Sequence, residues 1–198
     1  GYWVSRLVYV AAKLRLADLL RGRSRTVEEL ASAADVQPDA LYRLLRALAS
    51  VGIFAETKGR RFKLTPLAAT LQTGVSNSMH AWALMINENW AWDSWKELFH
   101  GVKTGEIPFL KAHGMPIFQY LGTHPEDLEV FGESMSSISR TENPAIAAAY
   151  KFPQCRTLVD VGGGHGSLLA AILKANPKLK GVLFDQGAVI ARAENDQY

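Results

Sequence analysis

The chain has 198 residues, of which 48% are hydrophobic and 21% charged, the balance of a folded globular protein rather than a disordered one. Its single cysteine, Cys155, excludes an internal disulfide and a multi-cysteine metal site, and it favours a reducing, cytoplasmic location. We expect no membrane association, because the sequence has neither an apolar run of ~20 residues nor a signal-peptide pattern.

The N-terminal residues predict amphipathic helices. Apolar residues recur at helical spacing over 4–20, and the pattern stops in a turn at 21–25. Thr26 and Glu29 form the pattern of a capping box, in which each side chain bonds the backbone N–H of the other residue. A short helix is therefore expected from this point to about Ala34.

A further helix and a hairpin are predicted next. Pro38 suits the first position of a helix, and Gly52 suits the position just after its end. Alternating runs at 53–56 and 61–64 flank a turn at 58–60 and predict a β-hairpin. Helices followed by a hairpin in this order predict a winged helix-turn-helix.

The middle of the chain is expected to be mainly α. We predict helices at 65–74, 78–98, 116–120, 125–140 and 143–150, with an irregular connection over 101–114. We place the domain boundary at 101–105, which divides the chain into domains of residues 1–100 and 101–198.

The last third predicts one βαβ unit. Residues 157–161 and 181–185 have the β-branched apolar pattern of buried strands, and 167–175 that of the helix between them. This order predicts the start of a Rossmann-like α/β domain with a parallel, doubly wound sheet.

The loop from Asp160 to Gly166 carries the clearest chemical signal. Gly162, Gly164 and Gly166 lie between a strand and a helix, where glycine permits tight turns and close approach of a ligand to the backbone. Asp185 follows Gly166 by nineteen residues, near the ~20-residue spacing of an acid that binds ribose hydroxyls. Together these residues predict a site for a cofactor that contains a ribose.

The details of the loop favour S-adenosylmethionine over NAD. Dinucleotide loops usually have two residues before their last glycine, whereas this loop reads Asp-x-Gly-x-Gly-x-Gly. Asp160 ends the first strand, where its carboxylate can meet a positive group such as the methionyl amine. We therefore expect S-adenosylmethionine as the cofactor.

With these motifs, the sequence resembles the small-molecule O-methyltransferases of the plant caffeate and isoflavone type and their bacterial relatives in secondary metabolism. The resembling segments are 102–109, 131–135, 158–167 and 182–186, together with the N-terminal winged helix. The resemblance implies methyl transfer from S-adenosylmethionine to a hydroxyl of a small aromatic metabolite. It also implies a homodimer, in which the winged-helix domain forms the interface and helps close the partner's active site.

The resemblance assigns roles to particular residues. It implies that the methionyl side of the cofactor is lined by Asp160, Gly162, Gly163, Gly164 and Gly166. Asp185 would bind the ribose, and Gln186 would lie beside the adenine. Two further cofactor contacts would come from the preceding helix, namely Met135 and Ser139. Phe131 would border cofactor and acceptor, and the resemblance leaves a role at the acceptor pocket open for Trp82 or Trp90. No metal is implied.

The resemblance also implies a longer protein. The chain stops after the second strand of the sheet, and the expected catalytic base, a histidine, would lie beyond Tyr198, since none of the five histidines present matches its position. One alternative is therefore a catalytically inactive, dimerising fragment.

A winged-helix DNA-binding regulator is the other alternative. Residues 1–65 hold twelve Lys/Arg and six Asp/Glu, whereas 66–198 hold ten and thirteen, and a basic winged helix is typical of DNA-binding proteins. Against it, the helix residues 41–50 contain no Asn or Gln to contact bases, and their leucines leave little polar surface. The sequence favours the enzyme.

Overall fold

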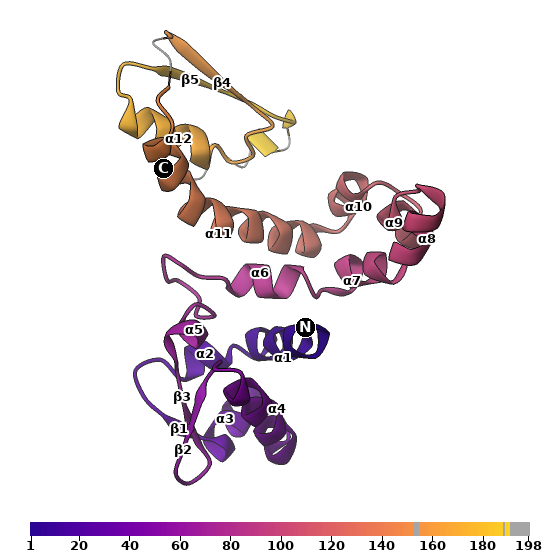
Figure 1. Cartoon of the computed structure of the whole chain (residues 1–198), viewed down its shortest axis with the longest axis vertical. Coiled ribbons are helices and arrows are strands. Elements are labelled where there is room, and N and C mark those ends of the chain that lie inside the picture. Colours follow the sequence, from indigo (N-terminus) through magenta and orange to yellow (C-terminus); the bar gives the residue numbers. More distant parts are fainter. Residues whose placement is uncertain (153–154, 188, 191–198) are drawn as a thin grey trace. The chain divides into compact units, whose positions relative to one another are not determined.

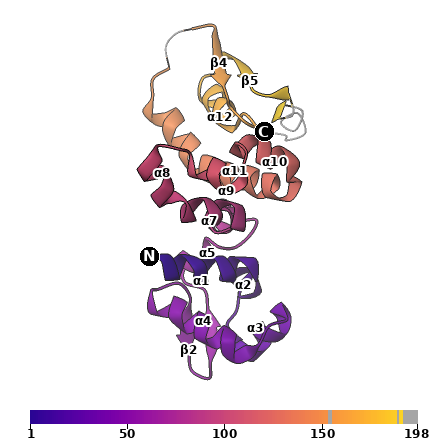
Figure 2. The same ribbon diagram turned by 90° about the vertical axis from the view of Figure 1, so that its right-hand side faces the viewer.

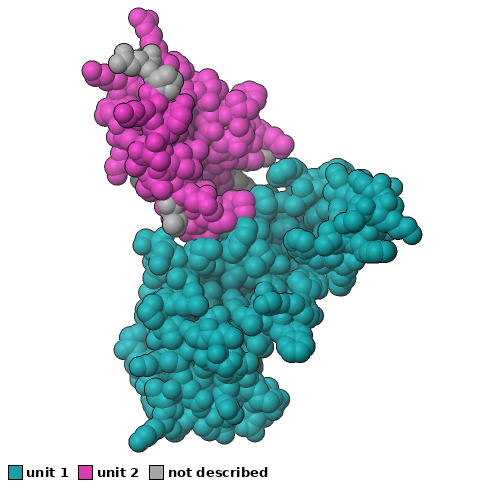
Figure 3. Space-filling view, viewed as in Figure 1, with its two compact units in different colours: residues 1–134 teal, residues 135–198 magenta. Residues whose placement is uncertain are grey.

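The computed structural model describes residues 1–152, 155–187, 189 and 190, and the chain divides into two compact units, residues 1–134 and 135–198 (Figure 3). The first unit contains α1 (Tyr2–Lys13), α2 (Leu16–Leu19), β1 (Arg25–Thr26), α3 (Val27–Ala34), α4 (Pro38–Ser50), β2 (Ala55–Thr57), β3 (Arg61–Lys63), α5 (Pro66–Ala69), α6 (His80–Met85), α7 (Asn89–Lys96), α8 (Leu98–Thr104), α9 (Pro108–His113) and α10 (Ile117–Thr123) (Figure 1). The long helix α11 (Pro125–Ala149) follows, and then β4 (Thr157–Val161), α12 (Ser167–Ala175) and β5 (Lys180–Phe184). The described part of the chain is thus mostly helical, with two small sheets.

The first predicted helix is broken in two. Arg15 adopts a left-handed conformation with φ of 52° and separates α1 from α2. Leu16 and Leu20 follow the break and are fully buried, so core packing stabilises a backbone that the apolar spacing alone does not reveal. The single helix expected over 4–20 was therefore wrong.

The capping box is confirmed. The Glu29 N–H donates to Thr26 Oγ1 at 3.1 Å, and the Thr26 N–H donates to a Glu29 carboxylate oxygen at 2.6 Å. The helix that follows, α3, ends at Ala34 as predicted. Pro38 is likewise confirmed in the first turn of α4, which ends at Ser50, just before Gly52.

The predicted hairpin is present as β2 and β3, and a third strand joins it. The antiparallel sheet has the order β1-β3-β2, with Arg25 paired to Phe62 and Glu56 paired to the other side of Phe62. Phe62 is fully buried in the main core, together with leucines of α2, α3 and α4. Strand β1 was not predicted: Arg25 was expected in a turn and Thr26 as a helix cap, and these two residues form a strand only through pairing with β3.

The predictions for residues 65–123 were partly wrong. The helix expected over 65–74 is the short α5, and the helical segment expected over 78–98 is divided into α6 and α7. The expected connection over 101–114 contains α8 and α9. Gly105 and Gly114 are left-handed residues that end these helices, and Pro108 begins α9. Glycine and proline here mark helix ends rather than an irregular segment.

The two helices expected between 125 and 150 form one helix, α11, which continues through Pro144. The break was expected near Asn143. In the structure, the Asn143 side chain is buried and its Nδ2 donates to Ser167 Oγ at 2.9 Å. This contact belongs to the second unit and could not be read from local sequence.

The predicted βαβ unit is confirmed. Strands β4 and β5 are parallel, with Asp160 paired to Leu183 and Val161 to Phe184. Helix α12 lies against one face of the pair, where Leu169 and Leu173 approach Gly181 (Figures 1 and 2). This packing fixes the end of β4 and the start of α12, and therefore the loop between them.

Among the residues that the structure describes, no helix combines the length and the apolar character needed to cross a bilayer.

Candidate functional site

The loop between β4 and α12 is built on left-handed glycines. Gly162, Gly164 and Gly166 have φ of 75°, 60° and 80°, a conformation that side chains with a Cβ rarely adopt. The Gly162 N–H donates to the Phe184 carbonyl at 2.7 Å and ties the start of the loop to β5. Gly166 is the N-cap of α12, so the loop leads directly into a helix N-terminus. The sequence pattern predicted this geometry.

Gly163 is needed for a different reason. A Cβ at this position would lie 2.5 Å from Asp160 Oδ2 and 2.6 Å from Leu183 Cδ1, closer than real Cβ contacts. At Gly166, a Cβ would lie 3.1 Å from Leu183 Cδ2. Leu183 thus supports the loop from β5, a role that sequence reasoning missed, because the residue reads as an ordinary strand leucine.

Asp160 presents an unsatisfied acceptor. Its Oδ2 atom is buried and has no hydrogen-bond partner among the described residues. A buried carboxylate oxygen without a donor is costly, and native proteins rarely retain one without a functional reason. The position beside Gly163 fits a ligand that brings a positively charged donor, such as the methionyl amine of S-adenosylmethionine.

Asp185 anchors the loop from the end of β5. Its Oδ2 accepts a hydrogen bond from the Gly164 N–H at 2.8 Å, and its Oδ1 accepts one from the Gln186 N–H at 2.7 Å. A carboxylate has about four lone-pair sites, so two remain for other donors. The arrangement therefore leaves capacity for the ribose hydroxyls, and it adds a structural role that the sequence did not indicate.

The remaining predicted cofactor residues lie at separate positions. Gln186 is exposed directly after Asp185. Met135 and Ser139 are partly buried on α11. The Asn143–Ser167 hydrogen bond, one helical turn beyond Ser139, ties α11 to the first residue of α12. The loop residues, Leu183 and Asp185 are thus brought together, whereas the contribution of α11 stays a prediction.

The two predicted acceptor residues lie in the first unit, on neighbouring helices. Trp82 is on α6 and Phe131 on α11, both partly buried. Ser134 Oγ lies 2.8 Å from Met85 Sδ, which brings these two helices together. Phe131 also makes an edge-to-face contact with Phe118, at 6.2 Å between ring centroids. Their role toward an acceptor stays a prediction.

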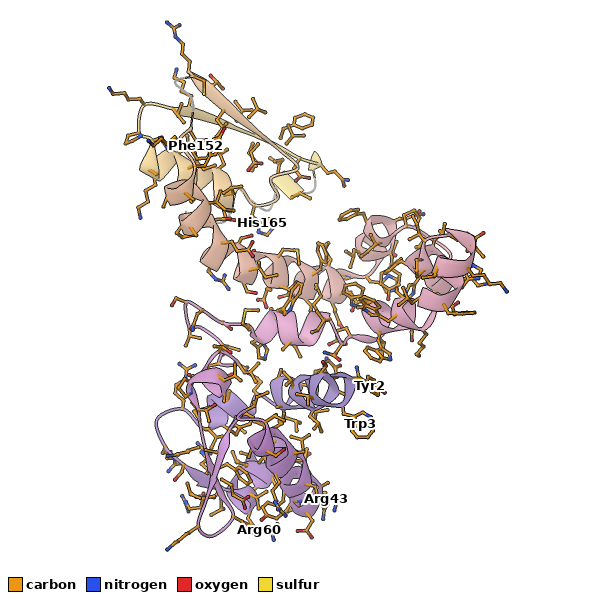
Figure 4. The ribbon with its side chains drawn as sticks, in the orientation of Figure 1. Tyr2, Trp3, Arg43, Arg60, Phe152 and His165 are labelled. Carbon is orange, nitrogen blue, oxygen red and sulfur yellow. The ribbon has the colours of Figure 1, made fainter. Side chains whose placement is uncertain are left out.

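The histidines are engaged in structural contacts. His80 Nε2 lies 3.1 Å from the Ala12 carbonyl, and His113 Nε2 lies 2.8 Å from the Trp90 carbonyl. His100 pairs with Glu106, and His124 bonds the Tyr120 carbonyl. His165 lies in the glycine loop (Figure 4). Within the described ranges, no group of His, Cys, Asp and Glu side chains could hold a metal ion.

Six of the twelve lysines and arginines of residues 1–65 lie in ion pairs with nearby carboxylates in the described part of the chain. Arg60 lies 3.0 Å from Asp39 and 3.6 Å from Glu28, and the acidic partners hold the pKa of Arg60 above its ordinary value. Other pairs are Arg46 with Glu56 and Arg61 with Glu29. Arg43 and Arg60 lie in the same α-helical and hairpin region (Figure 4). Cations committed to local carboxylates are poorly placed to neutralise phosphates.

Two family models match the chain. A model described as an O-methyltransferase dimerisation domain matches residues 1–74, and one described as an O-methyltransferase domain matches residues 95–197. The second match covers more than half of the chain and includes the glycine loop and Asp185.

Named O-methyltransferases are similar to this chain in both sequence and structure. The chain is 42% identical to the phenazine O-methyltransferase PhzM of Lysobacter antibioticus, over 98% of this chain and 56% of that protein. The crystal structure of LaPhzM superposes with a TM-score of 0.93 at 41% identity, covering 98% of this chain and 58% of that one. CalO1, a methyltransferase of calicheamicin biosynthesis solved in its SAH-bound form, gives a TM-score of 0.85 at 32% identity, with coverages of 100% and 59%. The chain spans about half the length of the curated relatives that it matches. By its sequence and its fold, the chain belongs to the O-methyltransferase family.

Proposed function

We propose that the protein transfers a methyl group from S-adenosylmethionine to a hydroxyl of a small aromatic secondary metabolite. The observation that carries this proposal is the loop between β4 and α12, where left-handed glycines, the unpartnered Asp160 Oδ2 and the Asp185 carboxylate converge. Family membership supports it, as do relatives whose names describe methylation of phenazine, puromycin and mitomycin compounds.

The loop residues would hold the cofactor. Asp160 would accept a hydrogen bond from the methionyl amine, and Asp185 would accept bonds from the ribose hydroxyls through its two unused lone-pair sites. The glycines at positions 162, 163, 164 and 166 have no side chain beyond Cα, which would let the cofactor approach the backbone. Gln186 would lie beside the adenine, with Met135 and Ser139 as further contacts. When bound, S-adenosylmethionine supplies a methyl group activated by its sulfonium.

The chain's own residues would contribute binding and orientation. Methyl transfer is an in-line displacement, so holding the reacting groups in line supplies much of the rate. Phe131 and Trp82 are proposed contacts of the aromatic acceptor. Deprotonation of a phenolic hydroxyl requires a base, and we place that base beyond Tyr198.

We also propose a division of the protein into two domains and its assembly as a homodimer. Residues 1–100 would be a winged-helix dimerisation domain and residues 101–198 the start of the cofactor-binding domain. The dimerisation-domain match to residues 1–74 supports a homodimer. A cytoplasmic location is consistent with the single cysteine.

Titration calorimetry tests the cofactor assignment. S-adenosylmethionine and NAD are titrated separately into this chain and into its Asp185→Ala variant. The proposal expects heat of binding from S-adenosylmethionine only, weakened at least tenfold in the variant. Binding of NAD in preference to S-adenosylmethionine would contradict it.

A further inference from the structure

Helix α11 continues through a proline, and the residue before that proline is buried. Pro144 has no N–H to donate to the Arg140 carbonyl, and its ring disfavours a helical backbone at the preceding residue, Asn143. Asn143 is nevertheless helical and only 6% exposed. An asparagine is seldom buried unless its amide is hydrogen-bonded. The local sequence therefore opposes the helix at this point, and a contact outside the helix is needed to stabilise it.

That contact joins α11 to the first residue of α12. Asn143 Nδ2 donates to Ser167 Oγ at 2.9 Å, and the end of α11 lies beside α12 (Figure 1). The two residues are 24 positions apart, and both belong to the second unit. Ser167 directly follows Gly166, the left-handed N-cap of α12. The contact is therefore made at the end of α12 where the glycine loop enters the helix.

The glycine loop is bonded to the same end of α12. The Gly166 N–H donates to the Gly163 carbonyl at 2.9 Å, and the Gly166 carbonyl accepts from the Ala170 N–H at 2.9 Å. Leu183 of β5 lies against Gly166, where an added Cβ would be 3.1 Å from its Cδ2 atom. The N-terminal end of α12 is thus held by β5 at Gly166 and by α11 at Ser167. A displacement of Ser167 would move Gly166 and, through its hydrogen bond, Gly163.

From this arrangement we propose that Asn143 is a positioning residue for the cofactor, acting through Ser167 on the glycine loop. Without the Asn143 amide, the start of α12 would lose its contact with α11, and the loop would lose part of the geometry that receives S-adenosylmethionine. A preorganised site binds more tightly because less order is lost on binding. The inference rests on the proposed function and goes beyond it, since Asn143 acts without touching the cofactor.

A double-mutant cycle tests whether Asn143 acts through Ser167. S-adenosylmethionine is titrated calorimetrically into the wild type, Asn143→Ala, Ser167→Ala and the chain with both substitutions. We expect each single variant to raise the dissociation constant about three- to tenfold, the range for the loss of one hydrogen bond. Because both substitutions remove the same bond, the double variant should bind no more than about twofold more weakly than the weaker single variant.

Asn176→Ala is the matched control at the other end of α12. Asn176 Nδ2 donates to the Ile172 carbonyl at 2.9 Å, so this variant also loses one asparagine hydrogen bond of the same length. It should bind the cofactor as the wild type does, because Asn176 lies at the end of α12 away from the loop. Ser167→Thr keeps a hydroxyl for Asn143 and should bind within about threefold of the wild type. Urea unfolding verifies that each variant is folded.

Amide NMR of the cofactor-free chains gives a spectroscopic readout. The resonances of Gly163 and Gly166 should shift in Asn143→Ala and Ser167→Ala and stay in place in Asn176→Ala. A role in folding alone would lower stability without moving these loop amides or the affinity.

The outcomes separate this inference from the proposed function. Folded Asn143→Ala and Ser167→Ala chains with wild-type affinity would overturn the positioning role and leave the cofactor assignment standing. A double variant whose effect is the sum of the two single effects would also overturn it, as would a Ser167→Thr chain as weak as Ser167→Ala. A wild type that binds no S-adenosylmethionine would overturn the proposed function and this inference with it.

Discussion

The Asp185 carboxylate holds the glycine loop from the neighbouring strand, through a 2.8 Å hydrogen bond from the Gly164 N–H. The two residues are 21 positions apart: Gly164 lies in the loop between β4 and α12, and Asp185 directly follows β5. The residue expected to bind ribose is thus also the residue that shapes the loop on the methionyl side. We therefore expect cofactor binding and loop geometry to be coupled through this one side chain.

Replacing Asp185 should affect stability and binding together. Asp185→Ala leaves the Gly164 and Gln186 N–H groups without their acceptor, so we expect a loss of ~1–3 kcal/mol in unfolding free energy. Gln186→Ala is the control, because its side chain is exposed and its backbone N–H is retained, and it should change stability by less than ~0.5 kcal/mol. Urea unfolding measures both. Equal stabilities for the two variants would show that the Asp185 bonds do not hold the loop.

Gly163 should not tolerate even one methyl group. Gly163→Ala places a Cβ against the Asp160 and Leu183 side chains, so these side chains or the loop must shift, at a cost of ~1–3 kcal/mol. We also expect S-adenosylmethionine binding to weaken at least tenfold. Gly187→Ala is the matched control, because no atom lies within 4 Å of its added Cβ. Thermal unfolding and calorimetry provide the two readouts, and a Gly163→Ala chain that matches this control would refute the close packing.

We expect a substitution of Asp160 to weaken cofactor binding without lowering the stability of the fold. Asp160→Asn removes the charge of a buried, unpartnered acceptor, so the unfolding free energy should stay the same or rise by up to ~1 kcal/mol. Binding should weaken about 10- to 100-fold, since a charge-assisted hydrogen bond to the methionyl amine contributes ~1.5–3 kcal/mol. A variant that loses stability and keeps its affinity would assign Asp160 to folding instead of binding.

The lowered pKa of Asp18 makes the unfolding free energy of the first unit depend on pH. Burial raises its pKa, but hydrogen bonds from the Thr73 backbone N–H and from Arg21 outweigh burial, so the pKa of Asp18 is lowered from its ordinary 3.8. The stabilisation is fully present above pH 3.8 and is lost as the pH falls through the lowered pKa. Asp18→Asn should therefore cost about 1 kcal/mol at pH 7, discounted for partial exposure, and less at pH 2 than at pH 7.

Urea unfolding of the wild type, Asp18→Asn and the exposed control Glu133→Gln at both pH values measures this effect. The control should follow the wild type. A cost of Asp18→Asn that is the same at both pH values would contradict the assignment.

Local signals were sufficient for much of the fold. The capping box at Thr26, the proline that begins α4 and the strand-loop-helix order around the glycines depend on neighbours within a few residues, and each was predicted correctly. The glycine loop could be recognised for the same reason, since its backbone conformation is encoded in its own residues.

The missed features depend on distant partners. Strand β1 exists only through its pairing with β3, and the break at Arg15 through the burial of the leucines that follow. Gly105 and Pro108 end one helix and begin another, although the same residues are equally compatible with an irregular connection. The support of the loop by Leu183 and the bond from Gly164 to Asp185 require the parallel register of β4 and β5, which periodicity does not specify.

NMR of individual backbone amides, recorded while S-adenosylmethionine is titrated into the isotope-labelled chain, tests most directly whether the glycine loop binds the cofactor. We predict saturable chemical-shift changes concentrated at Asp160 to Gly166 and at Asp185 and Gln186, with the amides of α3, α4 and the hairpin unchanged. Absence of shifts at the glycine loop, or shifts confined to other regions, would contradict the central claim that this loop binds the cofactor.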